Sequence, residues 1–329
     1  MAARVGALTE GLEVVDLRRI SGRQLDPLLL EETAEWKHEL HWDFAKSAEL
    51  VRQFTDTRAL TGAALLDRGE VVGYGYSVVE DQKGLIGDLY VRREWRTPDS
   101  MLLLFRALLD GLTGLRTLRR IESQLMLVDP RIGAEHRASQ ALKVYERLLM
   151  SFDCFDRDAA LPAPKAGARR RFHLEPWGDH LQESVAVVIA MAYQDHIDSR
   201  INDQYGTIAG ARRFVANIVQ FPGCGVFFRA GSFVAFDPAT GRLAGILLVS
   251  FVSSDVGHIT QLCVTPEAQR SGLGYEMLLK GLAALRAGGA KKVTLTVTAG
   301  NTGAVDLYRR CGFQVLRRFA AFVWDAPAG

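Results

Sequence analysis

The chain has few cysteines and no long apolar run. Its four cysteines lie far apart and form no C-x-x-C pair, which argues against a disulfide framework and a zinc site: Cys154, Cys224, Cys263 and Cys311. The N-terminal residues lack the apolar stretch of a secretory signal, and no later run approaches the roughly 20 residues of a membrane span. We therefore expect a cytoplasmic protein that holds no metal and contacts no membrane.

An excess of charge of either sign is also lacking. The 40 basic and 38 acidic residues give a formal net charge of +2, and no long run of one sign stands out. A surface dedicated to nucleic acid is therefore not expected. With 48% hydrophobic residues, the 329-residue chain has the composition of a globular protein and the length of two domains.

The two halves of the chain repeat one order of predicted elements. A stretch at 156–170, with prolines, alanines and charges but no apolar periodicity, predicts a linker between domains at 1–155 and 171–329. The second half predicts β-α-α-β-β-β-α-β-α-β-β, with strands at 225–237, 242–253, 257–264 and 291–298, helices at 181–193, 209–220, 272–286 and 301–310, and two closing strands. The first half predicts the same order, ending in a helix at 139–150.

One loop in the second half has the features of an anion site. Leu262-Cys263-Val264 predicts the end of a strand, and Gln269-Arg270-Ser271-Gly272-Leu273-Gly274 leads into a helix. The first turn of a helix presents unpaired N–H groups, and glycines let a phosphate approach the backbone. Met277 stands where a dinucleotide fingerprint needs a third glycine, and a P-loop ending is missing as well, so both nucleotide motifs are excluded.

A second motif follows the next predicted strand. The stretch from Asn301 to Phe313, NTGAVDLYRRCGF, begins with an N-cap residue and ends at a C-cap glycine. With Gln269, Gly272 and Gly274 it resembles the GCN5-related N-acetyltransferase (GNAT) superfamily, which has the patterns Q/R-x-x-G-x-G/A and N-x-x-A-x-x-L-Y-x-x-x-G-F. The resemblance implies an α/β (α+β) fold of two tandem GNAT-like domains, each a mixed, mostly antiparallel sheet flanked by helices.

The resemblance also implies an enzyme that transfers an acyl group, most commonly acetyl, from acyl-CoA to an amine. Backbone N–H groups from Arg270 to Gly274 would hold the CoA pyrophosphate, with Gln269 and Arg270 bordering the phosphates. Leu262, Cys263 and Val264 would pair with the pantetheine arm. Asn301 would lie beside the pantetheine or the acyl group, and Tyr308 would protonate the departing thiolate.

The general base is left open by the sequence. An amine acceptor must lose a proton before it attacks, and many GNAT members place a glutamate on the strand before the loop. This sequence has His258, Ile259, Thr260 and Gln261 there. His258 is suited to the task by the reference pKa of histidine, although a structural histidine is an equal interpretation, and a water held by Thr260 or Gln261 is another.

A polar loop between the first two helices of the second half is the candidate acceptor site. Asp198, Asp203 and Tyr205 lie there and, with Gln261, are the candidates for contacting a small-molecule or peptide amine; a solvated loop is the alternative. In the first half, Asp99 and Met101 align with the two loop glycines and Ala138 with the asparagine, while Tyr145 aligns with Tyr308. We therefore expect one acyl-CoA site per chain and a degenerate first domain.

Two other functions fit the same residues. One is a tandem acetyltransferase similar to mycothiol synthase, although no motif specific to that enzyme is present. The other is an acyl-CoA-sensing or interaction module without catalysis, which would need neither Tyr308 nor a polar acceptor loop. The acceptor and the acyl chain cannot be read from these residues, and the sequence fits a monomer or a homodimer.

Overall fold

The computed structural model describes residues 11–132, 142–154 and 172–326. The chain divides into two compact units, the first comprising Met1–Arg147 and Arg318–Gly329 and the second Leu148–Arg317. Each unit is described by itself. The predicted linker at 156–170 lies outside the described residues.

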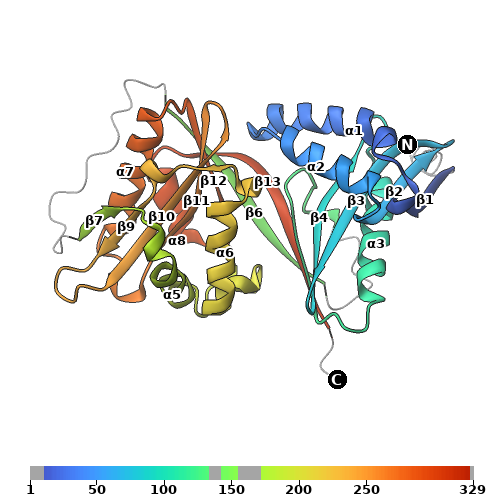
Figure 1. The fold of residues 1–329 in the computed structure, drawn as a ribbon. Coiled ribbons are helices and arrows are strands. Elements are labelled where there is room, and N and C mark those ends of the chain that lie inside the picture. Colours follow the sequence, from blue (N-terminus) through green and yellow to red (C-terminus); the bar gives the residue numbers. More distant parts are fainter. Residues whose placement is uncertain (1–10, 133–141, 155–171, 327–329) are drawn as a thin grey trace. The chain divides into compact units, whose positions relative to one another are not determined.

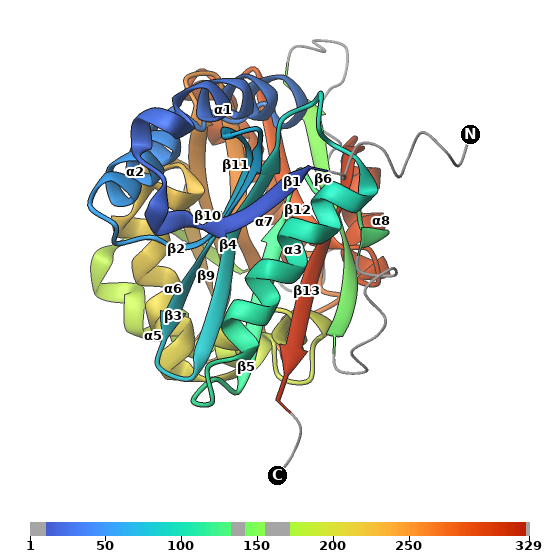
Figure 2. The ribbon, with the colours of Figure 1, turned by 90° about the vertical axis from the view of Figure 1, so that its right-hand side faces the viewer.

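The first unit is a mixed sheet covered by helices on both faces. The sheet order is β1-β2-β3-β4-β5-β13, and only β4 and β5 run parallel. On β3, Tyr74 contacts α1 while its neighbour Gly75 faces Leu108 of α3, so α1 and α3 cover opposite faces (Figures 1 and 2). The elements are β1 Leu12–Asp16, α1 Gly22–Glu35, α2 Ala45–Asp56, β2 Thr61–Asp67, β3 Glu70–Glu80, β4 Lys83–Val91, α3 Pro98–Thr113, β5 Arg120–Leu125, and the ends of β6 Leu142–Asp153 and β13 Gln314–Asp325 that fall in this unit.

The second unit repeats this plan. The sheet order is β6-β12-β11-β10-β9-β7, with β11 and β12 parallel. Leu247 of β10 packs in the core shared with α7, and Leu248 packs in the core shared with α5 and α6, so these helices cover opposite faces. The elements are β7 His173–Pro176, α5 Gln182–Ala192, α6 Ile208–Gln220, β8 Val226–Phe227, β9 Phe233–Phe236, β10 Leu243–Ser253, β11 Val256–Val264, α7 Leu273–Ala287, β12 Lys292–Thr298 and α8 Thr302–Arg310.

Strand register confirms the predicted correspondence between the halves. Leu89 lies opposite Gly75 in the β3–β4 pair, and Leu262 lies opposite Leu247 in the β10–β11 pair. In both strand pairs the register shifts by one residue, two positions before this leucine. Since such bulges bend a strand, both units part their two parallel strands at the same place.

The parallel pairing is equally short in the two units. β4 pairs with β5 through four residue pairs, the last joining Ile86 and Ser123. β11 pairs with β12 through four as well, the last joining Ile259 and Leu295. Beyond these pairs β4 and β11 each continue for five residues, to Val91 and Val264, so the first unit keeps the strand separation that the second unit has.

The predicted helix at 139–150 is wrong. Residues Leu142–Asp153 form strand β6, and the alternate residues Leu148, Met150 and Phe152 lie in the α7 core of the second unit. The side chains of this segment that enter the core therefore recur every second residue, as in a strand, and not with the period of a helix. Tyr145 lies on this strand and is not a helical counterpart of Tyr308.

The units also differ from the predicted domains. β6 belongs to the second unit from Leu148 onward, and β13 belongs to the first unit from Arg318 onward, where it pairs with β5. Each sheet is thus completed by a strand from the other half of the sequence. The two predicted closing strands are one strand, β13, and the predicted strand at 225–237 is broken by a 3₁₀ turn at Arg229–Gly231.

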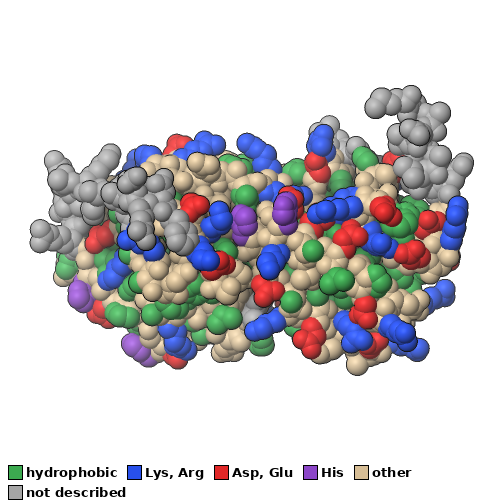
Figure 3. Space-filling model, turned by 90° about the horizontal axis from the view of Figure 1, so that it is seen from above, with side chains coloured by type: hydrophobic (Ala, Val, Ile, Leu, Met, Phe, Trp, Pro, Cys, Tyr) green, Lys and Arg blue, Asp and Glu red, His purple; other side chains and the backbone are tan. Residues whose placement is uncertain are grey.

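Side chains of both charges are interspersed over the surface drawn in Figure 3. This distribution agrees with the small net charge of the sequence. Among the described residues no helix is long and apolar enough to cross a membrane.

Candidate active site

The loop between β11 and α7 has the geometry that the first motif predicts. A 3₁₀ turn at Pro266–Ala268 follows the strand, and α7 starts at Leu273 with Gly272 as its N-cap. Glycine supplies no side-chain acceptor to the first turn. The hydroxyl of Ser271 accepts a bond of 3.3 Å from the N–H of Leu273 and donates one of 2.6 Å to the carbonyl of Ala268. The positive end of α7 therefore points into the loop.

The two loop glycines leave open space in front of this helix. Gly272 has φ 92°, a left-handed conformation that other residues adopt at a cost, and a Cβ there would meet no atom within 4 Å. At Gly274 a Cβ would meet only Val264, at 4.0 Å. Arg270 is also left-handed, with φ 59°, which for a non-glycine residue costs about 1–2 kcal/mol. The loop is thus shaped to admit a ligand close to its backbone.

Strand β11 supplies the second part of the site. Its pairing with β12 ends at Ile259, while its pairing with β10 continues to Val264. Leu262 and Val264 pack toward α7, and Cys263 packs toward α5 and α6. Burial raises the pKa of the Cys263 thiol to about 12, so this sulfur is uncharged at neutral pH and unsuited to act as a nucleophile.

Helix α8 carries the second motif. The Oδ1 atom of its N-cap Asn301 accepts a bond of 3.2 Å from the N–H of Ala304, and α8 ends before Gly312, which has φ 92°. Tyr308 is buried, with its ring centroid 5.9 Å from that of Phe313. The motif therefore fixes both ends of a short helix and the ring of its tyrosine.

The acceptor loop meets this helix through His196 and Asp198. The Nε2 atom of His196 lies 3.3 Å from Nδ2 of Asn301, and its Nδ1 lies 3.5 Å from the carboxylate of Asp198. Thr298, at the end of β12, donates its hydroxyl hydrogen to Asp198. Asp198 is thus a buried part of a polar cluster rather than a solvated loop residue.

Tyr193 joins the loop to strand β11. Its hydroxyl accepts a bond of 2.9 Å from Nε2 of Gln261, and its ring stacks on Tyr205 with centroids 4.4 Å apart. Burial raises the pKa of Tyr193, and the nearby Tyr205, Cys263, Asp198 and Tyr308 raise it further. The phenol is therefore neutral, and it lies within electrostatic range of the motif residue Tyr308.

His258 has a different environment from the other candidates. It lies opposite Thr294, where β11 and β12 are still paired, and its Nδ1 is 2.9 Å from the Thr294 hydroxyl. Burial lowers the pKa of His258 to about 4. An imidazole with so low a pKa is a weak proton acceptor for an ammonium group. The environment therefore favours the structural interpretation of His258.

The other predicted residues divide into two groups. Gln261 and Tyr205 contact the cluster through Tyr193, whereas Asp203 is exposed. Sequence reasoning did not single out Tyr193, His196 and Thr298. Tyr193 ends the predicted helix at 181–193 and His196 stands in the polar loop after it, and neither position alone indicates a buried contact.

Residues 208–313 match the model of the acetyltransferase (GNAT) family. The second unit, which contains this stretch, belongs to the GNAT superfamily. Mycothiol acetyltransferase of Mycolicibacterium gilvum is 38% identical over 117 residues, which are 34% of this chain and 39% of that protein. Mycothiol acetyltransferase of Saccharomonospora viridis is 28% identical over 179 residues, which are 52% of this chain and 54% of that protein. These alignments thus span about two fifths to half of the relatives' length.

Solved structures match nearly the whole chain. A GCN5-related N-acetyltransferase from Sphaerobacter thermophilus covers 95% of this chain and is covered to 95%, with a TM-score of 0.66 and 15% identity. A tandem GNAT protein from the clavulanic acid biosynthesis pathway covers 97% and is covered to 100%, with a TM-score of 0.59 and 18% identity. The fold of two GNAT units in one chain is therefore shared.

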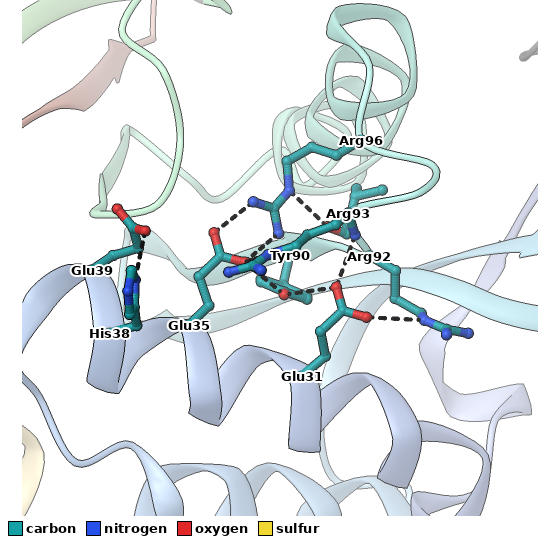
Figure 4. Close-up of polar contacts among 9 residues, drawn as sticks. Glu31, Glu35, His38, Glu39, Tyr90, Arg92, Arg93 and Arg96 are labelled. Atoms are coloured by element: carbon teal, nitrogen blue, oxygen red, sulfur yellow. Dashed lines mark hydrogen bonds and ion pairs between the residues drawn. The ribbon is translucent and has the colours of Figure 1, made fainter.

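In the first unit, internal partners occupy the loop that corresponds to the one between β11 and α7. Arg96 donates to both oxygens of Glu35 at 2.6 and 2.9 Å, and Arg93 donates its backbone N–H to Glu31 at 2.8 Å (Figure 4). Both carboxylates come from α1. Burial alone would raise the pKa of Glu35, but the hydrogen bonds and charge of Arg96 outweigh it and lower that pKa to about 2. The arginines of this loop are thus already paired with anions.

The helix after that loop is also capped. The Thr97 hydroxyl accepts from the N–H of Ser100 at 3.1 Å, and the Ser100 hydroxyl accepts from the N–H of Thr97 at 3.0 Å. Pro98 at the first helical position has no N–H. The N-terminus of α3 therefore offers fewer donors to a ligand than that of α7. Within the described residues, no group of three His, Cys, Asp or Glu side chains is placed to hold a metal ion.

Proposed function

We propose that the second unit transfers an acetyl group from acetyl-CoA to an amine. The observation that carries this proposal is the open start of α7, with glycine as its N-cap, beside the point where β11 leaves β12. In a GNAT protein this is where acyl-CoA is expected. The first unit, with a capped helix and paired arginines, binds no CoA in this proposal.

The loop holds the pyrophosphate through backbone N–H groups. Residues Gln269 to Gly274 surround it, with Arg270 and the positive end of α7 supplying favourable charge. Ser271 holds the turn at the helix start, because its N–H donates to the carbonyl of Ala268 and its hydroxyl accepts from the N–H of Leu273. The absence of a Cβ at Gly272 and Gly274 allows the close approach.

The pantetheine arm extends along the free edge of Leu262, Cys263 and Val264, with Asn301 at its side. A backbone N–H at this edge polarises the thioester carbonyl as negative charge develops on its oxygen. The amine nitrogen attacks the carbonyl carbon, the carbon–sulfur bond breaks, and Tyr308 gives its phenolic proton to the sulfur. Tyr308 is suited to this because its ring is held by packing against Phe313.

The acceptor lies on the α5 and α6 side of the sheet. Asp198, Tyr205 and Gln261 line this side together with Tyr193. A buried carboxylate beside stacked tyrosines suits a small amine or a peptide amine that carries a positive charge. The names of the similar proteins support a second candidate function, in which this chain acts as a mycothiol acetyltransferase.

Replacement of Tyr308 by phenylalanine tests the proposal. Tyr308→Phe keeps the ring packing but removes the proton, so turnover should fall about 10- to 1000-fold while affinity for acetyl-CoA is unchanged. Thiol release with a panel of amines measures the rate, and calorimetry measures binding. If turnover is unchanged, Tyr308 is only a core aromatic. If acetyl-CoA binds tightly and no amine is ever acetylated, the chain is an acyl-CoA sensor.

A further inference from the structure

Tyr193 and Gln261 connect the acceptor loop to β11 through one hydrogen bond. The phenolic oxygen of Tyr193 accepts from Nε2 of Gln261 at 2.9 Å. The ring of Tyr193 is held in place, because it stacks on Tyr205 with centroids 4.4 Å apart. Tyr193 also lies within electrostatic range of Asp198 and Tyr308. The pair is therefore placed between the acceptor loop and the tyrosine of the second motif.

This hydrogen bond leaves one donor and one acceptor of the pair unused. The Tyr193 oxygen accepts, so its own hydrogen is available, and its hydroxyl makes no other hydrogen bond within 11–132, 142–154 and 172–326. Burial raises the pKa of the Cys263 thiol to about 12, and a hydrogen bond with Gln261 opposes that rise. The amide nitrogen of Gln261 thus serves Tyr193 and Cys263, and its carbonyl oxygen has no partner in the described parts of the chain.

The same groups remain if the Gln261 amide is turned round. The phenol of Tyr193 would then donate to the amide oxygen, and an amide hydrogen and a phenolic lone pair would be left over. In either orientation the pair offers a donor and an acceptor on two different residues. Gln261 is only 4% exposed, and a polar atom in such a place is costly without a partner. A ligand that supplies both partners would remove this cost.

We propose that Tyr193 and Gln261 select acceptors in which an uncharged amide lies next to the reacting amine. This inference rests on the proposed function and names the substrate class of its acceptor site. An amide carries its acceptor and its donor on separate atoms, a carbonyl oxygen for the Tyr193 hydroxyl and an N–H for the Gln261 oxygen. An aminoacyl amide and the N-terminus of a peptide share this chemistry.

Other amines fit the pair less well. The two oxygens of a free carboxylate only accept hydrogen bonds, so a free amino acid gives the Gln261 oxygen no donor. Its negative charge is also repelled by the buried carboxylate of Asp198. An alkyl amine leaves the polar atoms of both Tyr193 and Gln261 without partners. We therefore expect an amine beside an amide to be acetylated faster than a free amino acid or an alkyl amine.

The first test measures thiol release from acetyl-CoA by the full chain. The amines are glycinamide, glycine and isobutylamine, which have the same number of non-hydrogen atoms. Tyr193→Phe keeps the stacked ring and should lower kcat/KM for glycinamide about 10- to 100-fold, while that for the other two should change less than about threefold. Each amine is compared with itself, so the different basicities of the amines cancel. Tyr145→Phe, on the part of β6 in the first unit, is the matched control and should leave every rate unaltered.

The same assay separates the two sources of the amide. A higher kcat/KM for pentaglycine than for glycinamide would favour a peptide, and the reverse order a small aminoacyl amide; either result supports the proposal if Tyr193→Phe lowers both. If glycine is the better substrate, or if Tyr193→Phe slows all the amines equally, the proposal is wrong.

The second test measures acceptor binding without acetyl transfer. With CoA in place of acetyl-CoA, NMR titration of the labelled chain should give a Kd for glycinamide that rises about 10- to 100-fold in Tyr193→Phe. Glycine should bind more weakly than glycinamide. If glycinamide binds in this way, acetyl-CoA binds and no amine is acetylated, the proposed function fails and the inferred selectivity stands. Equal affinity for glycinamide and glycine, or no effect of Tyr193→Phe, overturns the inference.

Discussion

The two units share one backbone plan and differ in the groups that lie at the start of the helix after the bulged strand. In both, a bulged strand leaves its parallel neighbour after four residue pairs. In the second unit the helix that follows starts at a glycine with open space before it. In the first, a capping box closes that helix and Glu35 pairs with Arg96. In the proposed function, side chains of the first unit thus take the place that a ligand has in the second unit.

A second contrast lies one residue before Leu89 on β4 and before Leu262 on β11. Gln261 and Asp88 occupy equivalent register positions, opposite Leu248 and Tyr76. Gln261 is neutral and donates to Tyr193. Asp88 shares its buried site with the acid Glu32, whose pKa is raised well above its usual value by burial and by the charge of Asp88. The first unit therefore buries an acid pair where the second unit places an amide toward its acceptor site.

The largest effect should come from separating the halves at the predicted linker. A fragment of residues 156–329 lacks β6, so β12 loses a neighbouring strand and the α7 core loses Leu148, Met150 and Phe152. We expect it not to fold, as measured by circular dichroism and acetyl-CoA binding. Within the full chain, Met150→Ala should destabilise the second unit by about 2–5 kcal/mol. A fragment that folds and binds acetyl-CoA would show that the exchanged strand is dispensable.

A charge in the open loop should have the next largest effect. Gly272→Asp places a carboxylate where the pyrophosphate is expected and should lower acetyl-CoA affinity more than 100-fold, or by more than about 2.7 kcal/mol. Gly272→Asn is the matched control, because it imposes the same backbone strain without charge and should retain more affinity. Calorimetry of the unchanged chain should find one site. Two sites of similar affinity would mean that the first unit also binds CoA.

Local patterns made the cofactor loop predictable from sequence. The glycines, Asn301 as N-cap and Gly312 as C-cap each act within a few residues, and the structure has the same turns and caps. The correspondence of Leu89 with Leu262 was also readable, because each is followed by a short loop and a helix. These turns and caps were predictable because their physical cause lies close by in the chain.

Contacts between distant residues were not predictable. Strand β6 owes its conformation to a core formed mostly by residues after 230, so a helix was predicted for it. Thr298 and Asp198 lie 100 residues apart, and their bond turns a polar loop into a buried cluster. His258 is suited to catalysis by type, but only its register with Thr294 shows that it is buried.

Breaking the ion pair that fills the first loop should have a moderate effect. Glu35→Gln leaves Arg96 without its buried partner and should destabilise the first unit by about 2–3 kcal/mol, less than for a fully buried pair because Arg96 is partly exposed. Amide exchange of β4 and β11 reports the two units separately. Asp26→Asn, at an exposed ion pair with Arg52, is the control and should change stability by less than about 1 kcal/mol. If Glu35→Gln and Asp26→Asn lower the amide protection of β4 equally, the Glu35–Arg96 pair contributes no more to stability than an exposed ion pair.

The smallest effect concerns pH and the buried acid pair. Burial raises the pKa of Asp88 to about 6, against an opposing hydrogen bond from Glu32, and the pKa of Glu32 is raised as well. Because the folded unit holds its protons more tightly than the unfolded chain, this pair favours folding fully below about pH 4 and loses that contribution as pH rises through about 6. Exchange at β4 should therefore show a first unit weaker by about 1 kcal/mol at pH 8 than at pH 5. Glu32→Gln removes one of the two acids. Its carbonyl can accept the Tyr74 hydroxyl and its amide can donate to Asp88, at the cost of the bond from the indole N–H of Trp36, and it should flatten this dependence. The second unit has Gln261 in place of Asp88, so exchange at β11 should lack this transition. A transition at β4 that survives Glu32→Gln unchanged would assign the pH dependence to other groups and remove the contrast between the two strands.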